Sequence, residues 1–387
     1  MQFILSRIIT FIAVLLVILG LSQVPSVEKP TAPISYNSPK SSSTTLEIFK
    51  NSTEASSNPK PSEETIPKFP SEPVSTKNIE SLPSKVEIPA SLPLPSIKDL
   101  SIPSLNTKVR QSVVNILCST LFGNPLKAVT GTGVVIDPGG VVLTNAHIAQ
   151  YYLLETLNGQ KYIDCTIRTG SPAYPAYRGK LLYISSRWVE DNKDNLNVEK
   201  PLGTGENDFG FILITEKSDG SPLSSDLPAL EVATDDSDVD RTSKVSHIVA
   251  AYPAGFLGFE AVEKELYMAS AVSYIKEVFT FKTTSIDLIS LGGTVVAQRG
   301  ASGGAVVSSR SDKLVGLIVT TSDALTTEDR DLRAITLSHI NRSIKEETGS
   351  DISDYLSGDL KQKQVNFGNN TFPYLSRLIQ SNIRVEN

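Results

Sequence analysis

Three stretches of this 387-residue chain hold side chains that together could carry out nucleophilic acyl transfer. Ser302 lies among glycines in RGASGGAVVSSR, His147 follows an apolar run in VVLTNAHIAQ, and Asp208 precedes an apolar run in NDFGFILIT. Acyl transfer needs a hydroxyl that attacks, an imidazole that takes its proton, and a carboxylate that orients the imidazole and stabilises its cation. The residue types and their places at predicted strand ends therefore predict a triad of His147, Asp208 and Ser302.

Other residues of the chain could fill two of these roles. Of the other two histidines, His247 lies inside the strand-like run SHIVAAYP and His339 opens a predicted helix, so both are interpreted as structural. Asp191 and Asp194 are rival acids, but they lie in a polar loop that no apolar strand follows. The sequence therefore favours the triad named above.

The same three stretches resemble the motifs of the trypsin-like, chymotrypsin-fold serine peptidases over about residues 113–347. GTGVVIDPGGVVLTNAHI is similar to the histidine motif, NDFGFILI to the aspartate strand and RGASGGAVV to the nucleophile loop. The strings RGASGG and TNAH are most similar to those of the bacterial HtrA-type branch. The resemblance implies a serine endopeptidase that cleaves polypeptide substrates through an acyl-enzyme. It implies no cofactor and no metal.

The resemblance also implies roles for residues around the triad. The backbone amides of Gly300 and Ser302 would form the oxyanion hole, where hydrogen-bond donors stabilise the charge that develops on a carbonyl oxygen. A pocket that favours a small or medium apolar side chain of the substrate would be lined by Val296, Thr320, Thr321 and Ser322.

Two departures from the family pattern limit what the resemblance implies. Ala301 stands where digestive members carry an aspartate that pairs with a newly cut N-terminus, so activation by that ion pair is not expected. About forty residues follow the last predicted helix, which is too few for the PDZ module that HtrA-type proteins usually carry. Regulation through such a module is therefore not expected either.

Short apolar runs along the chain predict an all-β fold class. Runs rich in Val, Ile, Leu, Thr and Tyr, separated by Gly, Pro, Asn and Asp, are typical of barrels and sandwiches. The predicted strands cover residues 113–117, 133–137, 141–144, 162–168, 179–184, 209–215, 245–250, 265–276, 286–290, 305–308, 314–320 and 334–338. We therefore expect two packed six-stranded antiparallel β-barrels, over about 107–216 and about 240–350, with a short C-terminal helix near 339–347.

The remaining segments indicate how this domain is presented. Residues 1–24 contain Arg7 followed by the apolar run IITFIAVLLVILGL, which is typical of a signal peptide or an uncleaved signal anchor. Residues 25–106 are rich in Pro, Ser, Thr, Lys and Glu and predict a disordered tether. The peptidase domain then covers 107–350, and 351–387 are expected to be a loosely ordered tail. We expect an extracytoplasmic protein, either secreted or held at the membrane by its N-terminal segment.

The charge of the chain argues against nucleic acid as a partner, and its two cysteines leave open whether it contains a disulfide. The formal net charge is -6 and the charges are scattered, so no basic stripe indicates a nucleic-acid surface, and nucleic acid is not expected as a partner. Cys118 and Cys165 lie in strand-like runs and could pair in an oxidising compartment or stay buried as free thiols. The sequence assigns no role to the polar insertion at 185–205.

Two other functions stay open on the sequence alone. The fold could serve as a catalytically silent, peptidase-like binding module, or the chain could be a cell-surface structural protein with the tether as its stalk. An intact triad argues against the first alternative. Labelling by a fluorophosphonate probe requires an activated serine, so it separates a peptidase from both alternatives.

Overall fold

The computed structural model of this chain describes residues 84–85, 101–121, 128–157, 159–198, 204–223, 226–239, 245–281, 285–321, 324, 326 and 328–383. The predicted signal segment and nearly all of the predicted tether lie outside these residues. Among the helices that the structure describes, none is long and apolar enough to span a bilayer.

Six antiparallel strands form a closed barrel with the order β2-β3-β4-β9-β8-β7. The side chains of β2 alternate between two apolar clusters, with Val113 and Leu117 in one and Val114 and Ile116 in the other. This alternation is what a strand buried on both faces requires. The six strands are β2 (Val113–Thr120), β3 (Val129–Asp137), β4 (Val141–Thr144), β7 (Ile163–Thr169), β8 (Tyr174–Ile184) and β9 (Gly210–Lys217).

A disulfide joins two neighbouring strands of this barrel. Cys118 of β2 lies opposite Cys165 of β7 in the antiparallel register, and their sulfur atoms are bonded. Of the two alternatives that the sequence left open, the structure therefore has the disulfide. Bonds of this kind form and persist in oxidising compartments.

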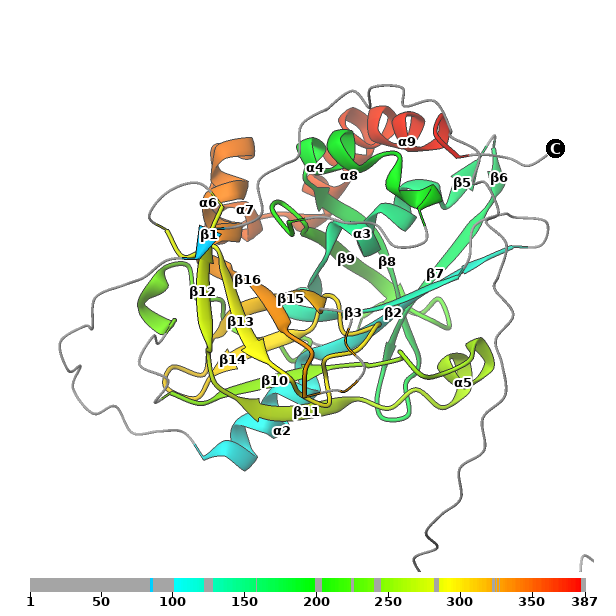
Figure 1. The fold of residues 1–387 in the computed structure, drawn as a ribbon. Helices are drawn as coiled ribbons and strands as arrows, with labels where there is room; N and C mark the ends of the chain where they lie inside the picture. Colours follow the sequence, from blue (N-terminus) through cyan, green and yellow to red (C-terminus); the bar gives the residue numbers. More distant parts are fainter. Residues whose placement is uncertain are drawn as a thin grey trace, which may run out of the picture. The chain divides into compact units, whose positions relative to one another are not determined.

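A second, curled sheet follows the barrel, with the order β1-β12-β13-β16-β15-β14-β10-β11 (Figure 1). The fold class predicted from the sequence is thus confirmed: the chain is mostly β, with a closed six-stranded barrel and a second curled sheet. The strands are β1 (Ser84–Lys85), β10 (His247–Ala251), β11 (Ala269–Ser273), β12 (Glu277–Thr280), β13 (Leu288–Gly292), β14 (Ala305–Ser308), β15 (Leu314–Thr321) and β16 (Leu332–Thr336).

Several short elements connect these strands. The strand predicted over 265–276 is too long, because β11 covers only Ala269–Ser273 of that range. These elements are α3 (Ala146–Ala149), η1 (Gln150–Leu154), β5 (Thr156–Leu157), β6 (Gln160–Lys161), α4 (Ser186–Asn192), η2 (Asn195–Asn197), η3 (Asp236–Asp238) and α5 (Phe259–Lys264).

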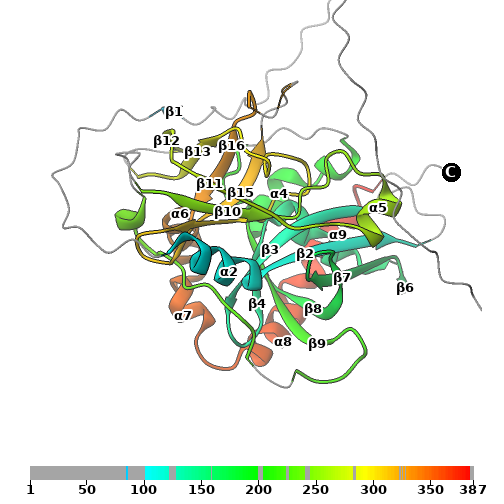
Figure 2. The ribbon, with the colours of Figure 1, turned by 90° about the horizontal axis from the view of Figure 1, so that it is seen from below.

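A helix stands where the sequence analysis placed the end of the tether. Helix α2 (Ile102–Ser112) contacts β10 and β3, so it bridges the two sheets (Figure 2). Its Leu105 and Val109 are 3% and 0% exposed and pack with Val113 of β2 in the core shared by both sheets. The predicted boundary at 106/107 is therefore wrong, because one apolar face of this helix completes a core that is built by distant strands.

Replacing Leu105 with alanine tests whether α2 belongs to the folded unit. Removing a buried leucine side chain and leaving a cavity costs about 2–5 kcal/mol, so the free energy of unfolding should fall by that amount. Ser104→Ala is the matched control, because Ser104 is exposed in the same helix and should change stability by less than about 0.5 kcal/mol. Equal urea midpoints for the two variants would show that α2 contributes nothing to the core.

The C-terminal part of the chain is helical. The predicted helix near 339–347 is confirmed as α6 (Leu337–Thr348), which begins where the Thr336 hydroxyl accepts a hydrogen bond from the His339 amide and ends at Gly349 with φ 79°. Glycine is favoured at this position because it adopts a positive φ without steric strain. Three further helices follow, α7 (Ile352–Leu356), α8 (Leu360–Asn370) and α9 (Phe372–Gln380).

The expected loose tail over 351–387 is therefore wrong for the residues that the structure describes. Leu375 and Ile379, four residues apart on one face of α9, are both 0% exposed and pack in the same apolar cluster as strands of the barrel. Helix α8 contacts β8, and α9 contacts η1 and α4. Phe372, Leu375 and Ile379 follow the three- and four-residue spacing of a helix face, so the sequence does carry a signal for α9, but it does not show the barrel surface that buries this face.

Candidate active site

Strand pairing brings His147 and Asp208 to one end of the barrel. His147 lies in α3, three residues after Thr144 ends β4, and Asp208 lies two residues before Gly210 begins β9. In the antiparallel ladder Thr144 is directly opposite Gly210. The residues that follow β4 and those that precede β9 must therefore emerge side by side.

Two hydrogen bonds fix the histidine against the aspartate. The Asp208 carboxylate places Oδ2 at 2.7 Å from His147 Nδ1, and its Oδ1 accepts a hydrogen bond from the His147 backbone N–H at 2.9 Å. The Asn145 side-chain amide donates to the Asp208 carbonyl at 2.9 Å. Asp208 is 6% exposed, so its carboxylate is held in place by protein groups rather than by bulk solvent.

This geometry selects one tautomer of the neutral imidazole. A carboxylate accepts hydrogen bonds, so the proton of a neutral His147 ring is held on Nδ1 and Nε2 is left as a lone-pair acceptor. Burial of His147 lowers its pKa, but the charge of Asp208 and its hydrogen bond raise it, and the net result is a pKa above the ordinary value of 6.5. The ring is therefore both oriented and made more basic.

The loop that carries Ser302 is hydrogen-bonded to the strands beside His147. The Ser302 carbonyl accepts from the Thr132 amide at 2.8 Å, and the Thr132 hydroxyl donates to the Gly300 carbonyl at 2.7 Å. The Thr144 hydroxyl, at the end of β4, donates to the Thr132 carbonyl at 2.7 Å. A chain of three hydrogen bonds thus connects the Ser302 loop to the strand end that leads into His147.

Gly303 shows how closely the loop approaches β3. A Cβ atom at this position would lie 1.9 Å from the Thr132 carbonyl oxygen, and the backbone has φ +84°. Both conditions exclude any residue with a side chain. The glycine after the serine is therefore required for the loop to dock on β3.

Two amide groups of this loop are available as hydrogen-bond donors. The Arg299 carbonyl accepts from the Ala254 amide at 2.7 Å, and the Ala301 carbonyl accepts from the Gly304 amide at 2.9 Å. Because a trans peptide is planar, the N–H groups of Gly300 and Ser302 point away from these two carbonyls. Neither N–H donates to any acceptor among the residues described.

The residues predicted to line the substrate pocket lie in different surroundings. Val296 is 0% exposed and packs in an apolar cluster of the second sheet. Thr320 and Thr321 belong to β15, but the structure describes only their backbone, and Ser322 lies outside the described residues. The substrate pocket stays a prediction.

The rival residues have other places in the fold. Asp191 lies in α4 and Asp194 follows it, while the acid that contacts the His147 ring is Asp208. His247 is buried in β10, and His339 lies in α6 with Nδ1 at 3.2 Å from an Asp287 carboxylate oxygen. Within the described parts of the chain, no group of three or more His, Cys, Asp and Glu side chains could hold a metal ion.

Residues of the motifs other than His147, Asp208 and Ser302 also position the site. Thr132 and Asn145 were not predicted, although both lie within the quoted histidine motif, and their polar side chains in apolar surroundings are the signal that could have indicated them. Asn207 has φ 58° and bonds through its side chain to Ser343 of α6, which ties the backbone before Asp208 to a helix far away in the sequence. No sequence signal indicates that last contact.

Comparison with known proteins identifies a similar structure but no family. No family model matches the chain, and no curated protein matches it. Among the solved structures that match is one described as "Crystal structure of Deg5", which is 16% identical, covers 62% of this chain and 90% of its own, and has a TM-score of 0.39. The function is therefore inferred from this chain's own residues.

Proposed function

We propose that this protein is a serine endopeptidase in which Ser302 is the nucleophile, His147 the general base and Asp208 the orienting acid. The observation that carries the proposal is that the Asp208 carboxylate contacts both the ring and the backbone N–H of His147. The loop that carries Ser302 docks beside them, and the backbone amides of Gly300 and Ser302 in this loop donate to no described acceptor. Such a set is what acyl transfer from a peptide bond requires. The resemblance of the three motifs to chymotrypsin-fold peptidases supports the same assignment.

The proposed reaction proceeds in two halves. Ser302 Oγ attacks the scissile carbonyl while His147 Nε2 takes its proton, and the resulting oxyanion accepts hydrogen bonds from the Gly300 and Ser302 amides. The protonated imidazole then gives its proton to the leaving amine, which breaks the C–N bond and leaves an acyl-enzyme. Water, deprotonated by the same imidazole, hydrolyses the ester and restores Ser302.

The setting of the reaction is part of the proposal. We infer that the enzyme acts outside the cytoplasmic membrane on polypeptides, secreted or anchored by its N-terminal segment, with an apolar residue preferred before the cleaved bond. The Cys118–Cys165 disulfide supports an oxidising compartment. The apolar run in residues 8–21 supports export.

A fluorophosphonate probe tests the proposal directly. The probe reacts with a serine whose hydroxyl is activated by a base, so we expect one label per chain, placed on Ser302 by mass spectrometry of the digested protein. Ser302→Ala should abolish labelling, and Ser311→Ala, which changes a serine in the turn after β14, should not. A label on another residue, or none at all, would favour the silent binding module.

The pH dependence of activity follows from the contacts of His147. His147 must be unprotonated to accept the serine proton, and Asp208 raises its pKa above 6.5. The value of kcat/KM should therefore be low at acid pH and rise with an apparent pKa above 6.5. A profile that is flat between about pH 5 and 8, measured with a peptide that does not titrate in this range, would exclude a histidine base.

A further inference from the structure

A tight turn leads the chain into Asp208. The Asp208 amide donates to the Gly205 carbonyl at 3.2 Å, which closes a β-turn with Asn207 as its third residue. Asn207 has φ 58°, and a positive φ at this position of a β-turn is adopted most readily by glycine and asparagine. The Phe209 amide then donates to the Asn207 carbonyl at 2.8 Å. The direction in which the chain enters Asp208 is therefore set at Asn207.

The side chain of Asn207 reaches from the barrel to a helix of the other half of the fold. Asn207 is 8% exposed, and its Oδ1 accepts a hydrogen bond from the hydroxyl of Ser343 in α6, which is 7% exposed. The two residues are 136 positions apart in the chain. A β-turn by itself requires no such contact. The asparagine therefore does more than supply a positive φ, because it ties the turn to α6.

Helix α6 is held firmly by the second sheet. Leu337, Ile340 and Ile344 are 0% exposed and pack in the core shared by both sheets. The helix follows β16 directly and contacts β15 and β16. Strand β15 pairs with β14, which begins three residues after Ser302. Ser343 is therefore a fixed point on the half of the molecule that carries the proposed nucleophile.

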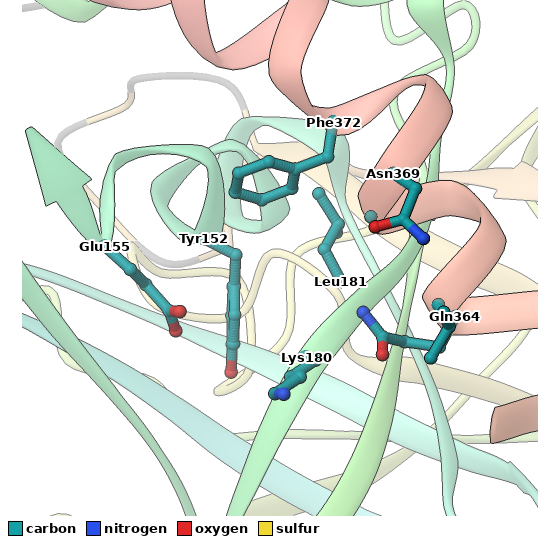
Figure 3. Close-up of a pocket in the computed structure, with 9 residues that line it drawn as sticks. Tyr152, Glu155, Lys180, Leu181, Gln364, Asn369 and Phe372 are labelled. Atoms are coloured by element: carbon teal, nitrogen blue, oxygen red, sulfur yellow. The ribbon is translucent and has the colours of Figure 1, made fainter. Parts of the chain in front are cut away.

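The segment of His147 has a separate support. Helix α3, which carries His147, continues into η1, where Tyr152 is 1% exposed. Figure 3 shows the Phe372 ring of α9 over Tyr152 of η1 and Leu181 of β8. All three side chains belong to one apolar cluster of the barrel and the C-terminal helices. Apolar packing thus holds the segment of His147, whereas a hydrogen bond from α6 holds the turn before Asp208.

We propose that Asn207 and Ser343 are positioning residues that align Asp208 with Ser302. The inference rests on the proposed peptidase function, because it concerns the same triad. Asp208 belongs to the barrel and Ser302 to the second sheet, so their relative positions depend on the bonds between the two sheets. The Thr132 hydroxyl makes one such bond, from β3 to the Ser302 loop. The bond between Asn207 and Ser343 makes another, from the aspartate turn to α6.

Loss of this bond should slow catalysis without weakening substrate binding. Ser343→Ala frees the turn, so the Asp208 carboxylate orients the His147 ring less well, and kcat should fall by about tenfold while KM stays within about twofold. Burial lowers the pKa of His147, and the charge and hydrogen bond of Asp208 raise it above 6.5. A looser contact should therefore also lower the apparent pKa in the pH profile of kcat/KM.

A double-mutant cycle separates this role from a general loss of stability. Asn207→Gly removes the side chain but keeps the positive φ without strain, and it should lower kcat as Ser343→Ala does. In the Asn207→Gly background, Ser343→Ala should change kcat by less than about twofold, because the bond is already absent. Tyr183→Phe is the matched control. It removes another hydrogen bond between the barrel and α6, from the Tyr183 hydroxyl to Glu347, and should leave kcat and the apparent pKa unchanged.

A readout that needs no activity distinguishes this inference from the proposed function. The chain has three histidines, so NMR of the full chain with isotope-labelled histidine can follow the titration of the His147 ring. We expect a lower pKa of His147 in Ser343→Ala and Asn207→Gly than in the wild type and Tyr183→Phe. If this pattern appears in a chain that hydrolyses no peptide, the proposed function fails and the hold on Asp208 stands. An unmoved pKa of His147 in both variants, or losses of kcat that add in the cycle, would overturn the inference.

Discussion

Replacing Ser302 with alanine is expected to lower kcat/KM for peptide hydrolysis by about 10⁴-fold or more. The substitution removes the atom that forms the acyl-enzyme in the proposed mechanism, while the amides of Gly300 and residue 302 remain. The melting temperature should change by less than about 2 °C, because the Ser302 hydroxyl makes no hydrogen bond in the described part of the chain and alanine fits the same backbone. Initial rates with a fluorogenic peptide and thermal unfolding by circular dichroism measure the two effects.

A loss of activity alone does not identify a nucleophile, so the control is as important as the variant. Ser311→Ala changes a serine of the turn between β14 and β15, outside the Ser302 loop; it removes one hydrogen bond from the Lys313 amide and should keep the rate while lowering the melting temperature by no more than about 4 °C. If Ser302→Ala keeps a tenth or more of the wild-type rate, the nucleophile is another residue. If the melting temperature of Ser302→Ala falls together with its activity, the loop has been displaced and the rate does not test the role of Ser302. The variant Ser302→Cys then decides, because it keeps a nucleophile of similar size at position 302. Labelling of residue 302 by a thiol-reactive probe is the expected result.

Asp208→Asn is expected to have the second largest effect, again on the order of 10⁴-fold in kcat/KM. An asparagine amide can donate to Nδ1 of His147, which then holds the ring proton on Nε2, and an Nε2–H cannot accept the proton of Ser302. The charge and the hydrogen bond that raise the His147 pKa are lost, while the burial that lowers it remains. The residual activity should therefore rise through a lower apparent pKa than in the wild type.

The pH profile separates this role from a structural one. A variant that was merely misfolded would lose activity at every pH in the same proportion, whereas the loss of Asp208 must also move the apparent pKa downward. Asp191→Asn in α4 is the matched control and should leave both rate and profile unchanged, because Asp208 is the acid that contacts the His147 ring. An unmoved apparent pKa in Asp208→Asn would contradict the proposed contact.

Local sequence patterns predicted the six strands of the barrel and most strands of the second sheet, but not β1 or β12, and they predicted the order of the three motifs. Strand β4 is VVLT and β9 is GFILITEK, and both are apolar runs with clear ends, so the polar residues just outside them could be located by inspection. Once these two strands pair antiparallel, the meeting of His147 with Asp208 follows from their place at the ends. The candidate acid and base could thus be chosen from sequence because the relevant signal is confined to a few residues.

Contacts between distant parts of the chain could not be predicted in this way. Docking of the Ser302 loop depends on the Thr132 hydroxyl, and that contact spans 168 residues between Thr132 and Gly300. Helix α9 has an apolar face of which Leu375 and Ile379 are the buried members, and the surface that buries it belongs to the barrel. The spacing of Leu375 and Ile379 indicates a helix, but it does not indicate which surface covers that helix, and Thr132 by itself is an ordinary polar residue.

The sequence by itself determined the chemistry that this chain can hold: a serine among glycines, a histidine after one strand and an aspartate before another. Only the tertiary structure decided that Cys118 pairs with Cys165, that α2 belongs to the core, and that the C-terminal helices pack against the barrel and η1. The physical reason is range. Strand and turn propensities act over a few residues and can be read locally, whereas a shared core, a disulfide and the packing of a helix on a barrel exist only where segments far apart in the sequence bury surface against one another.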